Sequence, residues 1–567
     1  MPASDPKLLP LYKSLKRRSS ELRPKSVVMT LSRLSRGVSR PPPFVVPSLC
    51  GSARSLAGSM SATEVANLFR GLSNLELRND ELLRALSARA LPIVDKLSSQ
   101  HITMILHACA NLPHHDPDLV EFLTHAATKI LYTFKPQELS GSLLALSKLS
   151  YQSIDRQFLM SLCAASESHL PSFNAQSVAN ACTALSHLPP LTSPSLLLAL
   201  QTRAANILDT FLPQNVAAVL NAMSKLGCDN HRFLDDLCAK ATTDLKHFNA
   251  TELALALNSQ TKFNYRRDLD FVKSICVEMS SKVNQLTPQG LSLTFNALGR
   301  LNYYDSDLVS SLCLAASRPA VVAALTPQGE STILHALARL YHYDAALLAL
   351  LCGKLATSPR SEESNQSVAN SIHSFAVLSH FDRPSLEALL SFVFSAPETS
   401  WIEEELLQLH FARVVFALEH EAPVFPPRLE RLLSAAASRA GPSPYAGGQD
   451  VVADVLAVLR SLKVEHDVGA DVGGLGVEVS IRGAKTVLEV TGPQDFLVDP
   501  TCKIRHLTGL RKCRERLLER QGYTVLRVSA SDWSSFPDHD SKERFLKLLL
   551  TRDGGEPAYL WSTYNWF

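Results

Sequence analysis

The sequence predicts a mainly helical protein: an α-solenoid of about nine or ten helical-hairpin repeats over residues 61–440, followed by a small α/β domain over residues 450–550. Three observations lead to this fold class. The phrase PQNVAAVLNAMSKL, which begins at Pro213, occurs nine times in altered form, with copies about 37 to 39 residues apart. Each copy has the apolar spacing of one helix face. Beyond residue 450 the periodicity changes to short β-like runs.

Composition and motifs exclude several classes of protein. The 567-residue chain contains no run that approaches the roughly 20 apolar residues of a membrane helix, so we expect a soluble protein without a membrane partner. The eleven cysteines form no CxxC pair and no group with zinc-like spacing, which predicts reduced thiols and no metal site. No phosphate loop, HExxH or GxSxG motif is present, so neither a cofactor nor a small-molecule substrate is expected.

The first 60 residues are strongly basic, with about 11 Lys and Arg against the two acids Asp5 and Glu21. The stretch VVMTLSRLSRGVSR can form a basic amphipathic helix, which PPPF at Pro41 to Phe44 then interrupts. Residues 1–60 are therefore predicted to be a transit peptide for the mitochondrial matrix, or alternatively a disordered basic tail that stays attached. The rest of the chain is net negative, so RNA contact would require positive charge focused on one face.

Each copy of the repeated phrase predicts the first helix of an αα-hairpin. If its first residue is position one, apolar residues recur at positions three, seven, ten and thirteen, as Val216, Leu220, Met223 and Leu226 illustrate. Position nine is nearly always small, which favours close helix approach. A second apolar helix follows, such as FLDDLCAKATTDLKHF from Phe233. A single hairpin cannot bury its own apolar face, so neighbouring hairpins must stack.

The opposite helix face, at positions one, five, eight and twelve, carries the predicted binding residues. Stacking would align position eight into a polar row and position twelve into a basic row, which suit the base edges and phosphates of single-stranded RNA. The position-eight candidates are Asn221, Asn258, Asn296, His335 and His373, and the position-twelve candidates are Lys148, Lys225, Lys262, Arg300 and Arg339. Alternatively, the basic residues only complement helix dipoles, and the array is a scaffold that binds a protein segment.

An αα unit of about 38 residues that often starts with Pro-Gln and ends with AL-x-[KR]-L resembles the octotricopeptide and heptatricopeptide repeats of organelle RNA-binding proteins. The copies are less clear after Leu378. EELLQLHFARVVFAL, from Glu404, is either a divergent tenth unit or a helical cap.

The turn-rich segment at 441–449 predicts a linker to the second domain. The domain then reads as a helix (VVADVLAVLRSL), two short strands (GVEVSIRG and KTVLEVTG), a basic amphipathic helix (LTGLRKCRERLLERQG), a strand (YTVLRVSASDW) and a closing helix (KERFLKLLL). Residues 551–567 end in the aromatic tail YLWSTYNWF, which is either a docking element or folds back onto the domain.

The phrase VLEVTGPQDF and the helix and strand after it closely resemble the RAP domain, a family named for its abundance in apicomplexan parasites. The resemblance covers roughly residues 485–550. The residues that carry the motif are Glu489, Gly492, Pro493, Phe496, Gly522 and Trp533, together with Thr508, Arg514, Leu518 and Tyr523. RAP domains are similar in fold to restriction-like endonucleases, so the resemblance implies a restriction-endonuclease-like domain and raises the question of nuclease chemistry.

That chemistry requires carboxylates for a divalent metal and a nearby Lys. The strand offers Glu489, but Thr491 stands where a nuclease would have Lys, and Ser480 where the family often has Asp. An acidic cluster of Glu478, Glu489, Asp495 and Asp499 remains conceivable. We therefore expect a binding domain and no enzyme, with a residual metal-dependent ribonuclease as an alternative. Its basic helix would contact phosphates through Arg511, Lys512, Arg514 and Arg516, with Arg505 and Arg520 nearby.

Together the two resemblances imply an organelle RNA-binding protein that grips single-stranded or ribosomal RNA. The preferred role is in stabilising or processing mitochondrial rRNA, or as a component of the mitochondrial ribosome. The expected partners are mitochondrial rRNA or mRNA and mitochondrial ribosomal proteins.

Overall fold

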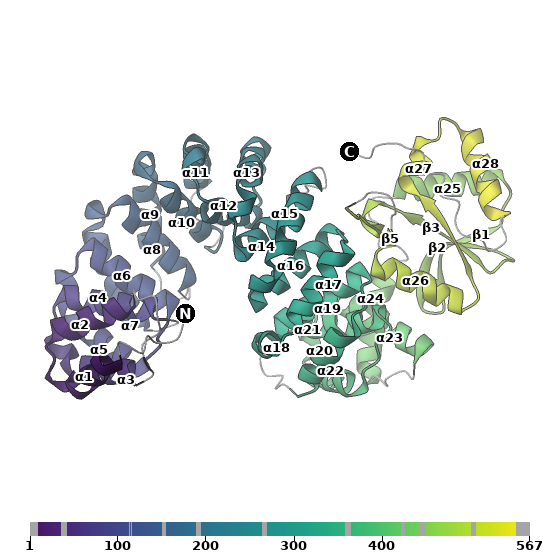
Figure 1. Ribbon diagram of the computed structural model, residues 1–567. Coiled ribbons are helices and arrows are strands. Elements are labelled where there is room, and N and C mark those ends of the chain that lie inside the picture. Colours follow the sequence, from purple (N-terminus) through teal and green to yellow (C-terminus); the bar gives the residue numbers. More distant parts are fainter. Residues whose placement is uncertain are drawn as a thin grey trace. The chain divides into compact units, whose positions relative to one another are not determined.

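Helical hairpins make up most of the chain, and a small α/β domain follows them (Figure 1). The computed structural model divides into two compact units, Met1–Phe248 and Asn249–Phe567. No helix among its described residues is both long and apolar enough to cross a membrane. The described residues are 9–35, 42, 44–112, 114, 116–149, 155–188, 194–263, 269–357, 364–420, 426–440, 449–500 and 506–551. Outside them lie Arg505, most of the predicted linker at 441–449 and nearly all of the predicted tail at 551–567.

In the first unit, the first helices of the hairpins are α2 (Pro24–Leu34), α4 (Ala62–Asn74), α6 (Ser99–Asn111), α8 (Pro136–Lys148), α10 (Ala175–Leu185) and α12 (Pro213–Leu226). The second helices are α3 (Val45–Leu56), α5 (Asp80–Ala90), α7 (Pro117–Lys129), α9 (Arg156–Ser168), α11 (Pro194–Asn206) and α13 (His231–Asp244). The helix α1 (Leu9–Arg17) precedes them, and most second helices end in a short 3-10 turn such as η9 (Leu245–His247).

In the second unit, the first helices are α14 (Ala250–Ser259), α16 (Pro288–Leu301), α19 (Pro327–Leu340), α21 (Asn365–Val377) and α23 (Glu403–Glu419). The outer helices are α15 (Leu269–Lys282), α17 (Ser306–Ala316), α18 (Pro319–Ala324), α20 (Ala345–Thr357), α22 (Arg383–Ser395) and α24 (Pro427–Ala440). Because α23 packs on α21 and is followed by α24, the divergent segment from Glu404 is a further hairpin of the array.

The predicted apolar face of the first helices is confirmed, and several of these helices begin with a side-chain cap. The Thr287 and Thr326 hydroxyl oxygens each accept a hydrogen bond of 3.1 Å from the backbone N–H three residues later. Val216, Leu220 and Met223 are completely buried. Each first helix packs against the first helix of the next hairpin within its unit, which is the stacking expected of hairpins that cannot bury an apolar face alone.

Part of the basic leader is helical and packs against the repeat array, which the sequence did not predict, while its role as a transit peptide stays a prediction. Helix α2 begins at Pro24, 38 residues before the start of α4 at Ala62, so it continues the repeat spacing towards the N-terminus. Val27, Val28 and Leu31 are buried, and α2 packs against α4. Sequence composition missed this hairpin because its polar positions hold Lys, Arg and Ser, which are also typical of transit peptides. Cleavage of the leader stays a prediction.

The C-terminal domain is built on a four-stranded sheet with the order β1 (His466–Val472), β2 (Leu475–Ile481), β3 (Thr486–Thr491) and β6 (Thr524–Ser529). β1 and β2 are antiparallel, as are β2 and β3, whereas β3 and β6 are parallel and pair Glu489 with Arg527. The predicted elements are present, but the last strand ends at Ser529 and Trp533 lies in a short helix, α27 (Ala530–Ser535). The strand β1 is an addition. The Gly-rich GADVGGLG around the β1–β2 turn concealed this exposed edge strand.

The helices α25 (Gln449–Ser461), α26 (Gly509–Arg520), α27 (Ala530–Ser535) and α28 (His539–Leu550) complete the domain, with a minor ribbon of β4 (Phe496–Leu497) and β5 (His506–Leu507). Val458, Leu488 and Trp533 lie in its apolar core. The Trp533 indole N–H donates a 2.8 Å hydrogen bond to Asp454. This tryptophan of the RAP motif therefore has a structural role.

Within the second unit, α26 lies against α19 and α21, so the C-terminal domain docks on the ends of the first helices. A Cβ atom at Gly509 would overlap the carbonyl oxygen of Ala338, and only glycine permits this approach. Arg516 forms an ion pair of 2.7 Å with Glu419 and donates to the Tyr341 hydroxyl at 2.9 Å. These contacts hold α26 directly against the hairpins.

Candidate nucleic-acid interface

The position-eight side chains of the second unit form a continuous row along its first helices. We call Asn258, Asn296, His335, His373 and Phe411 the polar row. Asn296 donates a hydrogen bond of 3.3 Å to Asn258, and the ring centroids of His335 and His373 lie 6.1 Å apart. The His373 ring is in turn 5.5 Å from that of Phe411. The predicted alignment of position eight is therefore present in this unit. Asn221, its counterpart in the first unit, is half-buried on α12.

The two histidines of the polar row are neutral at physiological pH. Burial lowers the pKa of His335 to about 4, with Arg339 and Arg300 adding to the effect. Burial likewise lowers the pKa of His373 to about 3. His373 is buried and the Nδ1 atoms of both rings are enclosed, so the two rings pack within the row rather than facing a ligand. The half-buried Asn258 and Asn296 are the groups of this row that remain open to a nucleobase.

In the first unit, the position-twelve side chains form a second row at the ends of the first helices. We call Asn111, Lys148, His187 and Lys225 the basic row; all four are exposed. Lys148 donates to Asn111 at 3.3 Å, and the Lys225 ammonium lies 2.9 Å from the His187 ring nitrogen. Burial lowers the pKa of His187, and Lys225 lowers it further, so the positive charge of this row is that of its two lysines.

The corresponding row in the second unit is shorter than predicted. Lys262 and Arg300 are exposed at their helix ends. Arg339, however, donates a 2.9 Å hydrogen bond to Asn302, whose amide nitrogen donates in turn to the carbonyl of Gln494 in the C-terminal domain. Val377, the next position-twelve residue, is buried and its carbonyl oxygen accepts from Arg516. Arg339 is thus part of the domain junction, and its predicted role as a phosphate contact is not supported.

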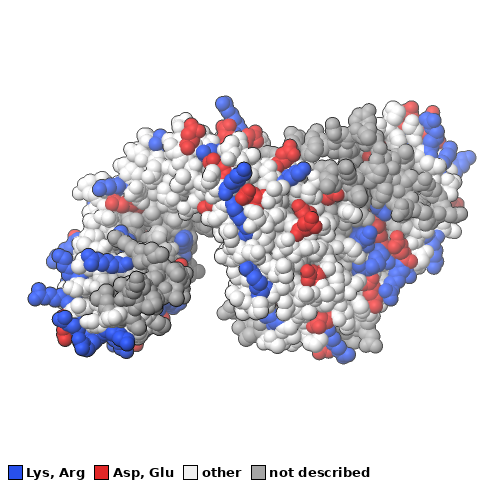
Figure 2. Space-filling view, viewed as in Figure 1, with Lys and Arg blue, Asp and Glu red and all other residues white. Residues whose placement is uncertain are grey.

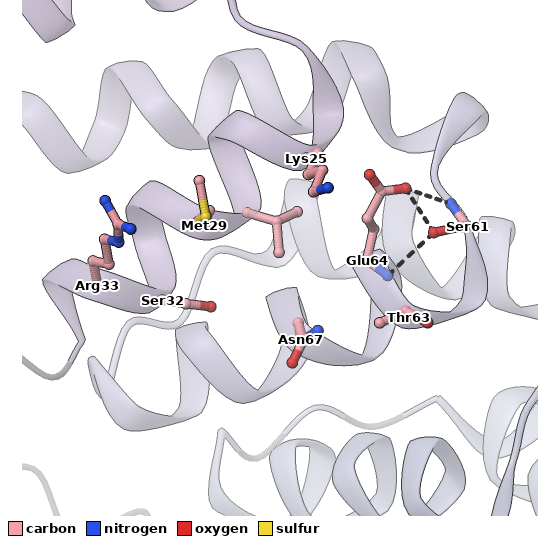
Figure 3. Close-up of a pocket in the computed structure, with 9 residues that line it drawn as sticks. Lys25, Met29, Ser32, Arg33, Ser61, Thr63, Glu64 and Asn67 are labelled. Atoms are coloured by element: carbon pink, nitrogen blue, oxygen red, sulfur yellow. Dashed lines mark hydrogen bonds between the residues drawn. The ribbon is translucent and has the colours of Figure 1, made fainter.

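Two grooves lie between neighbouring first helices, on the side of positions one and five. The groove between α16 and α19 is lined by neutral polar and apolar groups, among them Gln289, Asn296, Gln328 and Thr332. The groove between α2 and α4 is lined by Lys25, Met29, Ser32, Arg33, Thr63, Glu64 and Asn67 (Figure 3). Sequence analysis missed the α2 residues, although the phrase PKSVVMTLSRL has the start and apolar spacing of the other copies.

The C-terminal domain contains a buried cluster of charges where phosphate contacts were predicted. Arg511 forms ion pairs with Asp495 at 2.8 Å and Glu489 at 3.2 Å, and Arg514 pairs with Glu489 at 2.9 Å. Arg511 is only 4% exposed and Glu489 2%. With Arg516 committed to Glu419, three of the four predicted phosphate contacts on α26 are wrong, because these side chains are held inside the domain or at its junction. Lys512 is exposed.

The rest of the RAP motif builds the turn around this cluster. The Gly492 N–H donates to the Asp495 carboxylate at 2.9 Å, so this carboxylate ties the turn to Arg511. Pro493 and Phe496 flank that turn, and Gly522 has a positive φ of 83° where α26 passes into β6. Both oxygens of Glu489 accept from arginines. This arrangement engages the carboxylate that a nuclease would use to hold a divalent cation.

One group of side chains has the composition of a metal site. The ligand atoms of Cys313, His342 and Asp344 lie within 4.8 Å of one another. A similar arrangement recurs in two other hairpins. In each, a histidine contacts a Cys or Ser of the preceding outer helix, and the Asp two residues after that histidine caps the next outer helix. These groups are Cys352–His380–Asp382 and Ser87–His114–Asp116. Because Ser87 stands in for the thiol in one copy, this repeated contact is a link between hairpins rather than a metal site.

The neutral histidines predict a pH dependence of stability. Their folded-state pKa values lie below the unfolded value near 6.5, so protonation below pH 6.5 favours the unfolded state. We expect wild-type protein to lose stability on the order of 2 kcal/mol per buried histidine between pH 6.5 and 4.5, and His373→Gln to lose less. Urea unfolding at several pH values measures this, with the exposed His506→Gln as control. Identical pH profiles for wild type and His373→Gln would contradict the assignment.

The buried charge cluster predicts a large effect of a single substitution. Arg511→Ala should destabilise the second unit by about 3–5 kcal/mol, because Glu489 and Asp495 lose a buried partner. The neighbouring exposed Lys512→Ala should change stability by no more than about 0.5 kcal/mol. Urea unfolding followed by near-UV circular dichroism distinguishes them, and equal midpoints for the two variants would show that the cluster is not a structural centre.

Comparison with known families finds one match over the hairpins and another over the C-terminal domain. A model of the RNA-editing substrate-binding complex 6 protein family matches residues 10–131 and 107–346, and a model of the RAP domain matches residues 488–549. No curated protein matches the sequence. The RAP domain supports RNA binding, and the match over the hairpins supports a component of an RNA-processing complex. The first match spans residues 10–346, more than half of the 567 residues and including the basic leader, and the chain therefore belongs to the RNA-editing substrate-binding complex 6 protein family and carries a C-terminal RAP domain.

Proposed function

We propose that this protein holds single-stranded RNA along the first helices of its hairpins, as a component of a mitochondrial RNA-processing complex. The observation that carries the proposal is the arrangement of exposed cations at position twelve beside neutral polar side chains at position eight. Lys148 and Lys225 supply the cations in the first unit, and Lys262 and Arg300 supply them in the second. The polar row begins with Asn258 on α14, which Lys262 follows in the next turn, and with Asn296 on α16, which also carries Arg300.

The charged and the neutral side chains of this arrangement would contact different parts of the RNA. Phosphates attract Lys and Arg whatever the sequence of the RNA, and this attraction provides affinity. Unstacked bases are instead recognised by amides, which the half-buried Asn258 and Asn296 provide. The predicted base contact of His373 is not supported, because this ring is buried between His335 and Phe411. A protein-binding scaffold would not require exposed cations next to neutral amides in successive hairpins.

The proposed RNA and the proposed compartment rest on the name of the family and on the composition of the leader. The family's name describes an RNA-editing substrate-binding complex, which supports a place in an RNA-processing assembly. Mitochondrial rRNA or mRNA is the proposed ligand, the mitochondrial matrix the proposed location, and mitochondrial ribosomal proteins are proposed neighbours.

Charge reversal of three cations tests RNA binding. The combination Lys225→Glu, Lys262→Glu and Arg300→Glu should abolish detectable binding of a labelled single-stranded oligouridine. Wild-type affinity should fall steeply as salt rises, with about 0.7 in the logarithmic slope for each phosphate contact on a single strand. Fluorescence anisotropy at several salt concentrations measures both quantities.

The matched control reverses three exposed lysines on outer elements, Lys96, Lys129 and Lys273. This variant has the same net charge as the test variant and should keep most of the affinity. Equal loss in the two variants would mean that only net charge matters. A wild-type protein that does not bind RNA but retains a protein partner would instead favour the scaffold function.

We further propose that the RAP domain acts without nuclease chemistry. The support is that Arg511 and Arg514 engage the Glu489 carboxylate, and that Thr491 occupies the place of a catalytic Lys. Purified protein should leave a labelled single-stranded RNA intact in the presence of Mg²⁺. Cleavage that requires Mg²⁺ and disappears in Glu489→Ala, but persists in Lys512→Ala, would overturn this proposal.

A further inference from the structure

We propose that the groove between α2 and α4 binds backbone phosphates of single-stranded RNA, so that the basic leader is a working part of the RNA surface. This inference rests on the proposed function and extends it to a hairpin at which no binding residue was predicted. The ligand class is a polyanionic RNA strand, and the contacting groups are the side chains of Lys25 and Arg33.

Helix α2 has the same phase as the repeats that follow it. Aligned on the starting prolines of α2 and α12, Lys25 stands at position one, Met29 at position five and Ser32 at position eight. Val27 and Leu31 occupy the buried positions three and seven. Lys25, Met29 and Ser32 are therefore at the positions that face the proposed RNA path in later hairpins of this unit, whereas Arg33 stands at position nine, on the side of α2 that borders the groove.

α2 packs directly on α4, although less tightly than some later first helices pack on one another. A Cβ atom at Gly71, the small residue at position nine of α4, would lie 3.7 Å from the Ser32 hydroxyl and 3.9 Å from the Leu31 carbonyl carbon. This contact fixes the two helices side by side and places the α2 side chains at the edge of the groove (Figure 3). Removal of residues 1–60 would expose the face of α4 that now packs against α2.

The positive side chains of this groove are accessible to a ligand. Lys25 and Arg33 are both exposed, and eight helical residues separate them by about 12 Å along the axis, so they can contact different phosphates. Glu64, the acidic residue of the lining, accepts hydrogen bonds from the Ser61 backbone N–H at 2.9 Å and from its hydroxyl at 2.7 Å. This carboxylate serves as a helix cap and remains tied to Ser61 (Figure 3).

The surroundings of the groove reinforce its preference for phosphates. Figure 2 shows Lys and Arg gathered at the end of the first unit that carries α1 to α3. Lys13, Lys16, Arg17 and Arg23 are exposed there. By contrast, the groove between α16 and α19 is lined by amides, hydroxyls and apolar groups, and its lining includes no Lys or Arg. The two grooves therefore differ in ligand chemistry, with phosphate favoured at α2–α4 and bases at α16–α19.

The test is RNA binding by the full chain with Lys25→Glu and Arg33→Glu. We expect at least about tenfold weaker binding of a labelled oligouridine at low salt, and a logarithmic salt slope smaller by about 1.4 for two lost phosphate contacts. The matched control is Lys96→Glu with Lys129→Glu, two exposed lysines on outer elements of the same unit. This control should bind with nearly wild-type affinity and slope.

The outcomes separate this inference from the proposed function. A wild-type protein without salt-dependent RNA binding would overturn the proposed function and this inference with it. Wild-type binding with equal affinities and slopes for the test and control variants would overturn only the groove. The milder pair Lys25→Gln and Arg33→Gln, with an unchanged urea unfolding midpoint, keeps the test valid if the Glu variant does not fold. It should still reduce the salt slope.

Discussion

Close contact between neighbouring first helices is the constraint on which the rest of the structure depends. Gly299 and Ala336 illustrate it, because a Cβ atom at Gly299 would lie 3.2 Å from the Ala336 Cα. Small residues let the two backbones approach, and this approach fixes the rotation of each helix relative to the next. Once the rotation is fixed, residues at one repeat position must align. The polar row of the second unit and the basic row of the first are consequences of packing in the apolar layer beneath them.

The RAP domain follows a different physical rule. Its core contains several buried charges, and these are tolerated because each is paired: Glu489 with two arginines, and Asp495 with Arg511 and a backbone N–H. Arg516 extends the same principle to the junction with the hairpins, where it meets Glu419 and two backbone carbonyls. The guanidinium groups therefore organise the domain and its docking, and the exposed surface left for a ligand is smaller than the basic sequence indicates.

The sequence was sufficient for the parts of the fold that depend on local periodicity. The helix starts at Thr287 and Thr326, the apolar face of Val216 and Leu220 and the RAP motif all follow from residue type and spacing. Residue type and spacing did not predict which individual Lys and Arg side chains are exposed and which are paired inside the protein. Arg300 and Arg339 occupy the same repeat position, yet Arg300 is exposed and Arg339 bonds to Asn302 at the junction with the RAP domain. Arg511 and Lys512 are neighbours on one helix, and only tertiary contacts make the first an internal ion pair and leave the second in solvent. Such pairings join residues far apart in the chain, and no local pattern encodes them.

The basic leader shows why composition alone cannot separate targeting from binding. A transit peptide and a phosphate-binding hairpin both need Lys and Arg, few acids and an amphipathic helix, so one amino-acid composition is compatible with either role. Spacing and burial add information that composition lacks, because α2 keeps the 38-residue period and buries Val27, Val28 and Leu31 against its neighbours. The helix therefore contributes apolar surface to the array and covers α4 while the leader is attached, and targeting stays a prediction. Its Lys25 then occupies the same repeat position as Thr63 and Gln214 on later first helices of the same unit, where an RNA strand following those helices would meet it.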